Sequence, residues 1–300
     1  MFFFIKNILY RHFFIQLFSI FIIVFIVKAA DVTSDKTIST TVTAQQHIKT
    51  NSDITLSITN GGTISRSNYA IKVNATEAAA ADDATISVSS GGTVETTSGG
   101  NAIYAQDVSG LTIDNSGTIS SSESTKAIDV AGADDVTITN NSGGEIYANG
   151  RVITLGNATN VTINNSGKIY GTTGGNNADT IYGANNTASI TINNNSGGEI
   201  KNNGTNKAAI RLIKNSTITN SGTIKNDKGP DYNAIKLTGN NNTVNLKDEG
   251  IIVGKIESAG SNNTLKLNHG VGRSYYYETI GNFTLEDLDG NNVVKGSAGS

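Results

Sequence analysis

The chain contains no cysteine, no tryptophan and a single proline, Pro230. Without cysteine it forms no disulfide, and it offers neither a thiolate nucleophile nor a thiolate ligand for zinc. Histidine is almost as scarce, since the three are His12, His47 and His269. The last two are far apart in sequence, and neither has a Gly-x-Ser-x-Gly neighbourhood. A Ser-His-Asp triad is therefore not expected.

Aromatic residues are rare outside the N-terminus. Of the nine phenylalanines, eight lie between Phe2 and Phe25, and the ninth is Phe283. Charge is balanced, with 22 Lys and Arg against 25 Asp and Glu. No basic stripe or arginine cluster is present in the sequence, so nucleic-acid binding is not expected. Such a polar composition is also found in disordered chains, and only the order of the residues argues for a fold.

The N-terminus has the layout of a secretory signal peptide. Lys6 and Arg11 precede an apolar run at residues 13–27, and small residues follow at Ala29 and Ala30. A positive region, an apolar region and a small-residue site are typical of such signals. The alternative is an uncleaved membrane anchor, but the apolar run is shorter than the roughly 20 residues that a spanning helix needs. We predict a signal peptide over residues 1–29.

The rest of the chain is a repeat. A β-like phrase, then Asn-Ser-Gly or a variant, then a small or polar residue and Ile or Val, recurs down the sequence; residues 163–169, for example, read Ile-Asn-Asn-Ser-Gly-Lys-Ile. The closing residues of the phrase are Ile64, Val94, Ile119, Ile146, Ile169, Ile200 and Ile224. Self-similarity of this kind is the signature of a solenoid.

Each unit carries three strand signals with period-two alternation. In one unit these are Val136-Thr-Ile138, the single Ile146 after the turn, and the Ile153-Thr-Leu155 phrase. One unit cannot bury its apolar face, but stacked units can, with Ile upon Ile at roughly 4.8 Å. We therefore predict an all-β fold, a right-handed single-stranded parallel β-helix of roughly 8–9 coils with three short strands per coil.

Asparagines mark the turns. The five that directly precede Ser-Gly are Asn115, Asn141, Asn165, Asn195 and Asn220. Asn makes Asx turns and tolerates the left-handed conformation. Asparagines at equivalent positions of stacked coils can also bond to one another, so we predict that these five form a ladder.

Insertions vary in length mainly between the second and third strands. They cover residues 170–178, 201–207 and 226–233 and are rich in Gly, Asn and Lys. We expect them to project from one side of the solenoid, and variable insertions often mark the binding face of a repeat protein.

After Lys236 the rhythm changes. Residues 262–267 read Asn-Asn-Thr-Leu-Lys-Leu, a Gly-x-Ile step lies within residues 250–256, and an aromatic-plus-Leu phrase follows at residues 280–285. These phrases, with the upstream Asn-Ser-Gly-x-Ile repeats, resemble the passenger domains of bacterial autotransporters. The resemblance covers about residues 50–296 and depends on many weak motifs in register.

The resemblance implies export by the signal peptide and delivery to the cell surface by an outer-membrane β-barrel. Many such passengers are adhesins, self-association modules or carriers of an inserted enzyme domain. The alternating segments of a membrane barrel are not found before Ser300. The expected translocator therefore belongs to a longer form of the chain or to a separate protein. The predicted organisation is a signal peptide (1–29), an N-terminal extension or cap (30–50), β-helix repeats (51–242) and C-terminal coils of the passenger type (243–300).

The charged clusters of the sequence are interpreted as structural. Asp82-Asp83 and Asp134-Asp135 precede first strands, where Asp serves turns. Glu145 and Glu199 match in position and flank the coil that carries Lys168, which predicts alternating charge along the stack.

Three further features lie at single sites. The segment 287–292 mimics part of a calcium loop but lacks its spaced acidic ligands, which favours a turn. The tyrosines at 275–277 are expected to pack at the C-terminal end of the solenoid, the alternative being a stacking surface for sugars or a partner. Ser216 replaces the usual Val or Ile, so its hydroxyl is expected to face the core or to bond to backbone.

We therefore expect no catalytic, cofactor-binding or metal-binding residues. The predicted function is that of a non-enzymatic adhesin or self-association module, at the cell surface or outer membrane of a Gram-negative bacterium or outside the cell. The expected partners are the β-barrel translocator and a surface glycan, a protein ligand or a second copy of the chain. The alternatives are an exported polysaccharide-active enzyme built on a β-helix and a purely structural stalk.

Overall fold

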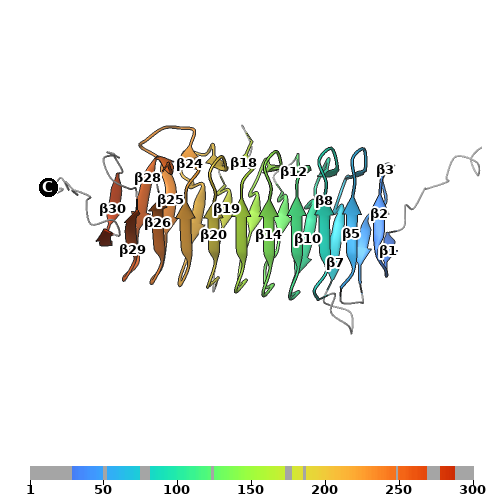
Figure 1. Cartoon of the computed structure of the whole chain (residues 1–300), viewed down its shortest axis with the longest axis horizontal. Coiled ribbons are helices and arrows are strands. Elements are labelled where there is room, and N and C mark those ends of the chain that lie inside the picture. The colour runs from blue at the N-terminus through green and yellow to red at the C-terminus, as the bar shows by residue number, and fades with distance from the viewer. Residues whose placement is uncertain are drawn as a thin grey trace, which may run out of the picture.

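The computed structural model describes residues 29–49, 53–74, 82–122, 125–172, 178–184, 187–247, 249–268 and 278–287. Every regular element within these ranges is a short β-strand. The strands form three parallel sheets whose members are three positions apart in the order of the chain. Figure 1 shows the coils stacked in sequence order along a rod. The structure confirms the predicted right-handed parallel β-helix with three strands per coil.

The first strands of the coils form sheet B, which has eleven members. They are β2 (Lys36–Ile38), β5 (Thr55–Ile58), β8 (Thr85–Val88), β11 (Thr112–Asn115), β14 (Thr137–Asn140), β17 (Thr162–Asn165), β20 (Thr191–Asn194), β23 (Thr217–Asn220), β26 (Thr243–Lys247), β29 (Thr264–Asn268) and β31 (Thr284–Asp287).

The second strands form sheet C, with nine members. They are β3 (Thr41–Val42), β6 (Thr63–Arg66), β9 (Thr93–Thr96), β12 (Thr118–Ser121), β15 (Glu145–Ala148), β18 (Lys168–Gly171), β21 (Glu199–Asn202), β24 (Thr223–Asn226) and β27 (Ile251–Val253).

The third strands form sheet A, again with eleven members. They are β1 (Ala30–Val32), β4 (Gln46–Ile48), β7 (Ile71–Asn74), β10 (Ile103–Gln106), β13 (Ile128–Asp129), β16 (Ile153–Thr154), β19 (Ile181–Tyr182), β22 (Ile210–Leu212), β25 (Asn233–Leu237), β28 (Lys255–Ser258) and β30 (Thr279–Gly281).

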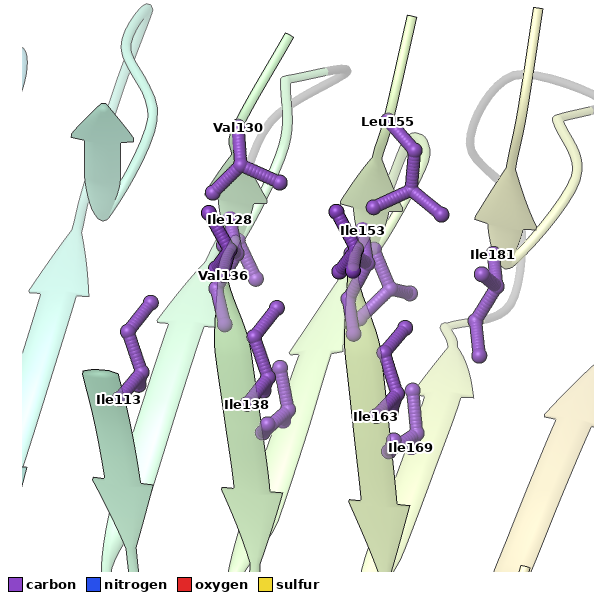
Figure 2. Close-up of a cluster of buried hydrophobic side chains, with 14 of the residues drawn as sticks. Ile113, Ile128, Val130, Val136, Ile138, Ile153, Leu155, Ile163, Ile169 and Ile181 are labelled. Atoms are coloured by element: carbon purple, nitrogen blue, oxygen red, sulfur yellow. The ribbon is translucent and has the colours of Figure 1, made fainter. Parts of the chain in front are cut away.

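The core is a stack of aliphatic side chains in register. Ile138 of β14 pairs with Ile113 below and Ile163 above, and all three are fully buried. Figure 2 shows them repeating at one position of successive strands, facing the isoleucines of the other two sheets. Full burial of such a side chain contributes roughly 1.5–3 kcal/mol. Because side chains alternate along a strand, residues next to each isoleucine point outward.

The predicted asparagine ladder exists, but two of its members differ from the prediction. Four hydrogen bonds of 2.8 Å link consecutive side-chain amides, each Nδ2 donating to the Oδ1 of the next coil. The five fully or almost fully buried members are Asn115, Asn140, Asn165, Asn194 and Asn220.

Asn141 and Asn195 were therefore assigned wrongly. Each lies one residue beyond the ladder, and Asn195 is exposed. Their coils carry two extra turn residues, and strand register keeps Asn140 and Asn194 as the inward residues opposite Asn165. The two extra residues are accommodated in the turn outside the strand, where Asn195 Nδ2 donates to Ser166 Oγ at 3.1 Å.

The N-terminal segment 30–50, interpreted as an extension or cap, contributes strands to all three sheets. β1 pairs with β4, β2 with β5, and β3 with β6, all in parallel. Residues 30–48 are thus part of the stack although they lack the Asn-Ser-Gly phrase. In the described part of the chain, no helix is long and apolar enough to cross a membrane. The signal peptide predicted over residues 1–29 lies outside the described residues except for Ala29.

Candidate functional site

The outward side of sheet A carries a row of chemically diverse side chains. Strand pairing brings one outward residue from each of six consecutive coils into line, and we call this set the outer row. Its members are Lys72, Tyr104, Asp129, Thr154, Tyr182 and Arg211. Neighbours in the row are one inter-strand step apart, roughly 4.8 Å. The equivalent outward positions of sheet B are mostly Thr, Ser and Asn, for example Thr139 and Asn164.

Asp129 is a buried carboxylate in the middle of the outer row. Its side chain is only 1% exposed. Three donors reach its Oδ2: Lys126 Nζ at 2.8 Å, Asn101 Nδ2 at 3.2 Å and Gln106 Nε2 at 3.3 Å. Such donors offset the cost of removing a charge from water. Its second oxygen, Oδ1, is buried and has no hydrogen-bond partner among the described residues.

Thr154 is the next member of the row and pairs with Asp129 in register. It is 5% exposed. Its hydroxyl is buried and also lacks a partner in the described part of the chain. Two adjacent buried polar atoms without partners are unusual, because nearly all such groups in folded proteins are hydrogen-bonded. The row therefore has unused hydrogen-bonding capacity at Asp129 and Thr154.

Two guanidinium groups converge on Tyr182. The Cζ of Arg151 lies 3.7 Å from the ring centroid, and that of Arg211 lies 5.4 Å away. Arg211 Nη1 is 3.7 Å from Oδ2 of Asp179, a carboxylate whose Oδ1 accepts a 2.8 Å hydrogen bond from the Ala208 amide. The Nε of Arg211 is buried and has no partner within the described ranges. No carboxylate among those residues pairs with Arg151.

The other end of the row is aromatic. The rings of Tyr69 and Tyr104 are 4.8 Å apart between centroids, and Lys72 Nζ lies 5.8 Å from the Tyr104 ring. The Tyr104 hydroxyl donates to Oε1 of Gln106. Burial raises the pKa of Tyr104, and the nearby Tyr69 and Asp129 side chains raise it further. Tyr104 therefore stays protonated and neutral at physiological pH.

The segments between second and third strands supply much of this face. Lys126, Arg151 and Asp179 lie shortly before β13, β16 and β19, respectively. They contact the outer row from the side on which the insertions were predicted to project. The insertion at 170–178 is described only in part, since residues 173–177 lie outside the described ranges.

The acidic pairs considered in the sequence lie in turns, as predicted. Asp83 and Asp135 have φ values of 58° and 54°, a left-handed conformation that Asp tolerates. Asp82 Oδ1 accepts a 3.0 Å hydrogen bond from the amide of Ser109 on the next coil. These carboxylates serve the backbone and are not grouped with the outer row.

The predicted alternation of charge on sheet C is also confirmed. Lys168 pairs in register with Glu145 on one side and Glu199 on the other. Its Nζ lies 3.4 Å from Glu145 Oε1. Tyr147 and Tyr170 stack beside this pair, with centroids 5.0 Å apart. In this part of sheet C the charges therefore already have partners.

Ser216 has a backbone role. Its hydroxyl donates to the carbonyl of Lys214 at 2.8 Å and accepts from the amide of Ile190 at 3.2 Å. The amide of Ser216 in turn donates to Oδ1 of Asn242 at 3.1 Å. The serine thus links the aliphatic coils to the C-terminal coils, where asparagine occupies the same position.

The histidines, the tyrosine cluster and the calcium-like segment considered in the sequence do not lie at the centre of the outer row in the described structure. His47 lies on β4, in register with Lys72, at the N-terminal end of sheet A. His269, the tyrosines at 275–277 and residues 288–292 of the calcium-like segment lie outside the described residues. Sequence reasoning missed the outer row. One signal was available for four of its members, the central residue of each Ile-x-Val or Ile-x-Leu phrase, but Tyr104 and Tyr182 lie in Ile-x-Ala and Ile-x-Gly phrases.

The outer row offers hydrogen-bonding groups and cations. Two carboxylates lie on this face, Asp129 in the row and Asp179 beside it. Both already accept hydrogen bonds from protein groups, which favours ligand binding over acid–base chemistry. Among the described residues, no group of three or more His, Asp, Glu or Cys could hold a metal ion. No protein-family model matches the chain, and neither a curated protein nor a solved structure matches it.

Proposed function

We propose that this protein is an exported, surface-displayed passenger of the autotransporter type that acts as a non-enzymatic adhesin or self-association module. The observation that carries the proposal is the outer row of sheet A. Over six coils the row presents aromatic rings, cations and buried polar atoms without partners among the described residues. Functional sites are where proteins retain such features.

Export is supported by the N-terminal sequence and by the nature of the core. Residues 1–29 have the charge and hydropathy pattern of a secretory signal. The described coils are stabilised by stacked aliphatic side chains and asparagine amides, and need no disulfide. The C-terminal phrases resemble autotransporter passengers, so an outer-membrane β-barrel is the proposed translocation partner. It belongs to a longer form of this chain or to a separate protein.

The shape of the molecule favours binding at a distance from an anchor. Successive coils extend the rod along one axis, so each adds a binding position without changing the fold (Figure 1). A surface glycan, a protein on another cell or a second copy of the chain are the proposed targets.

The experiment is surface display of the full gene in a Gram-negative host, with cell adhesion and autoaggregation as readouts. We expect both export and at least one of these activities, and deletion of residues 1–29 to abolish both. A protein that is exported but changes neither adhesion nor aggregation contradicts the proposal. Reducing-end and unsaturated-product assays on polysaccharides test the enzymatic alternative, whose success would replace it.

A further inference from the structure

We propose that Arg151, Thr154, Tyr182 and Arg211 form a binding site for the carboxylate or sulfate group of an acidic polysaccharide. The site lies on the outer row between β16 and β22. The inference extends the proposed function by naming the chemical class of one ligand.

Arg151 provides the clearest anion-binding group. Its guanidinium is held 3.7 Å over the Tyr182 ring and pairs with no carboxylate in the described residues. Stacking on an aromatic face fixes the plane of the group and leaves its N–H edge free for a bidentate contact. Carboxylate and sulfate oxygens have the spacing that this planar fork binds.

Arg211 approaches the same ring from the next coil. Tyr182 and Arg211 are paired in register, and the guanidinium carbon lies 5.4 Å from the ring centroid. Its only described ion pair is long, at 3.7 Å to Asp179, and its Nε is buried without a partner. Two guanidiniums lie on one ring and only Arg211 has a carboxylate beside it, which leaves an excess positive charge that an anion would neutralise.

Thr154 completes the anion site. It pairs in register with Tyr182 and lies on the same coil as Arg151. Its hydroxyl, buried in a residue that is 5% exposed, has no partner among the described residues. A hydroxyl can donate to an anion oxygen and so regain the hydrogen bond it lost on leaving water.

The next group in the row favours a saccharide over an acidic peptide. Asp129 pairs with Thr154, and its buried Oδ1 accepts no hydrogen bond within the described chain. A sugar carries hydroxyl donors beside its acidic group, and a carboxylate oxygen can accept from them, whereas an ionised glutamate side chain offers no donor. An anion-binding end followed by an acceptor matches a sugar that carries both an acidic group and hydroxyls.

The test measures binding of the purified full chain by isothermal titration calorimetry. The probes are polygalacturonate for carboxylate, heparin for sulfate, neutral dextran, and poly-glutamate as the acidic peptide. We expect binding to one or both acidic polysaccharides, with dextran and poly-glutamate at least about tenfold weaker. The ratio between polygalacturonate and heparin distinguishes the two anion sources. Equal binding of poly-glutamate, or no binding of either acidic polysaccharide, overturns the inference.

Variants locate the site. Arg151→Gln and Arg211→Gln are each expected to weaken binding about tenfold or more, and Arg151→Lys to restore only part of it, because a lysine cannot make the bidentate contact. Lys168→Gln on sheet C removes one positive charge away from the row and serves as the matched control. If it weakens binding as much as Arg151→Gln, the attraction is general and the site is wrong. Circular dichroism checks that each variant is folded.

The outcome is separable from the proposed function. If cells displaying the chain still adhere or aggregate while the purified protein binds no acidic polysaccharide, the adhesin proposal stands and the anion site does not. If Arg151→Gln reduces both binding of the polymer and adhesion of the cells, the anion site is the site through which the displayed protein adheres.

Discussion

At the scale of single residues, buried asparagines link successive coils through their side-chain amides. Each rung of the ladder fixes the position of a turn relative to the coil above, because the amide bonds to both side chain and backbone. Asn165, for example, donates to Asn194 Oδ1 at 2.8 Å and lies 3.2 Å from the carbonyls of Gly167 and Glu199. A ladder of this kind is intolerant of gaps, since each amide depends on its neighbours.

Replacement of one rung tests this dependence. We expect Asn165→Ala to destabilise the protein by about 2 kcal/mol, because Asn194 Oδ1 then loses its donor in a buried site. Thr162→Ala on the outward side of the same strand is the control, with an expected change within about 0.5 kcal/mol. Urea midpoints followed by circular dichroism provide the measurement. Equal effects of the two variants would contradict a structural role for the ladder.

Tyr170 is expected to make the free energy of unfolding fall at alkaline pH. Burial, followed by the charge of Glu145 and a 3.2 Å hydrogen bond to it, raises the pKa of Tyr170 well above its ordinary value. A tyrosine whose pKa is higher in the folded than in the unfolded state contributes its full stabilisation below about pH 10. This contribution is lost as the pH rises further, because unfolding then releases a proton.

We therefore expect Tyr170→Phe to reduce the loss of stability between about pH 8 and about pH 11. Glu145→Gln removes the second cause of the raised Tyr170 pKa but leaves burial, the larger one, so it should reduce the loss less than Tyr170→Phe does. Urea midpoints at the two pH values measure the effect. An unchanged pH dependence in both variants would show that Tyr170 does not titrate with unfolding.

At the scale of elements, the turn between sheets B and C permits close stacking only because of its glycines. A Cβ placed on Gly167 would lie 2.3 Å from the carbonyl oxygen of Gly144 and 2.5 Å from that of Asn141. Both atoms belong to the backbone of the coil below, so a side chain here cannot be relieved by a rotamer change. The glycine that directly precedes the second strand, Gly167 here and Gly144 and Gly198 in the coils with longer turns, is thus a packing requirement as well as a turn signal.

Gly167→Ala should therefore disrupt the stack locally, with an expected cost of about 3 kcal/mol. Gly197→Asn is the matched control, because φ there is +80° and a Cβ meets nothing within 4 Å. Asn tolerates that conformation, so the control should cost less than about 1 kcal/mol. Thermal unfolding of the two variants decides the question, and a smaller effect at Gly167 than at Gly197 would refute the packing argument.

Comparison of the strands and turns with the sequence shows which features its patterns could predict. Period-two isoleucines predicted the strands and their inward faces, because burial of one face is a local property of alternation. The Asn-Ser-Gly phrase did not reveal whether Asn140 or Asn141 enters the ladder, since only pairing with Asn165 decides it. The outer row was harder still to predict. Asp129 accepts hydrogen bonds from Lys126 of its own coil and from Gln106 of the coil below, and the second of these contacts lies between repeats, where no single repeat contains it.

At the scale of the whole molecule, stability comes from contacts between neighbouring coils. In the described strands every sheet partner belongs to the coil directly before or after, so distant coils share no sheet pairing. Stability of such an array is close to a sum of nearest-neighbour terms. The rod can therefore lose order in one region while the rest persists.

A central core substitution separates this behaviour from all-or-none unfolding. Ile163 is fully buried between Ile138 and Ile192, so Ile163→Ala leaves a cavity and should cost about 2–4 kcal/mol. Hydrogen exchange followed by mass spectrometry should then show protection lost in β14, β17 and β20 but retained in β5 and β26. Thr162→Ala, on the outward side of the same strand, should leave protection unchanged. A uniform loss of protection along the chain would mean that the coils unfold as one unit, and the nearest-neighbour description would have to be abandoned.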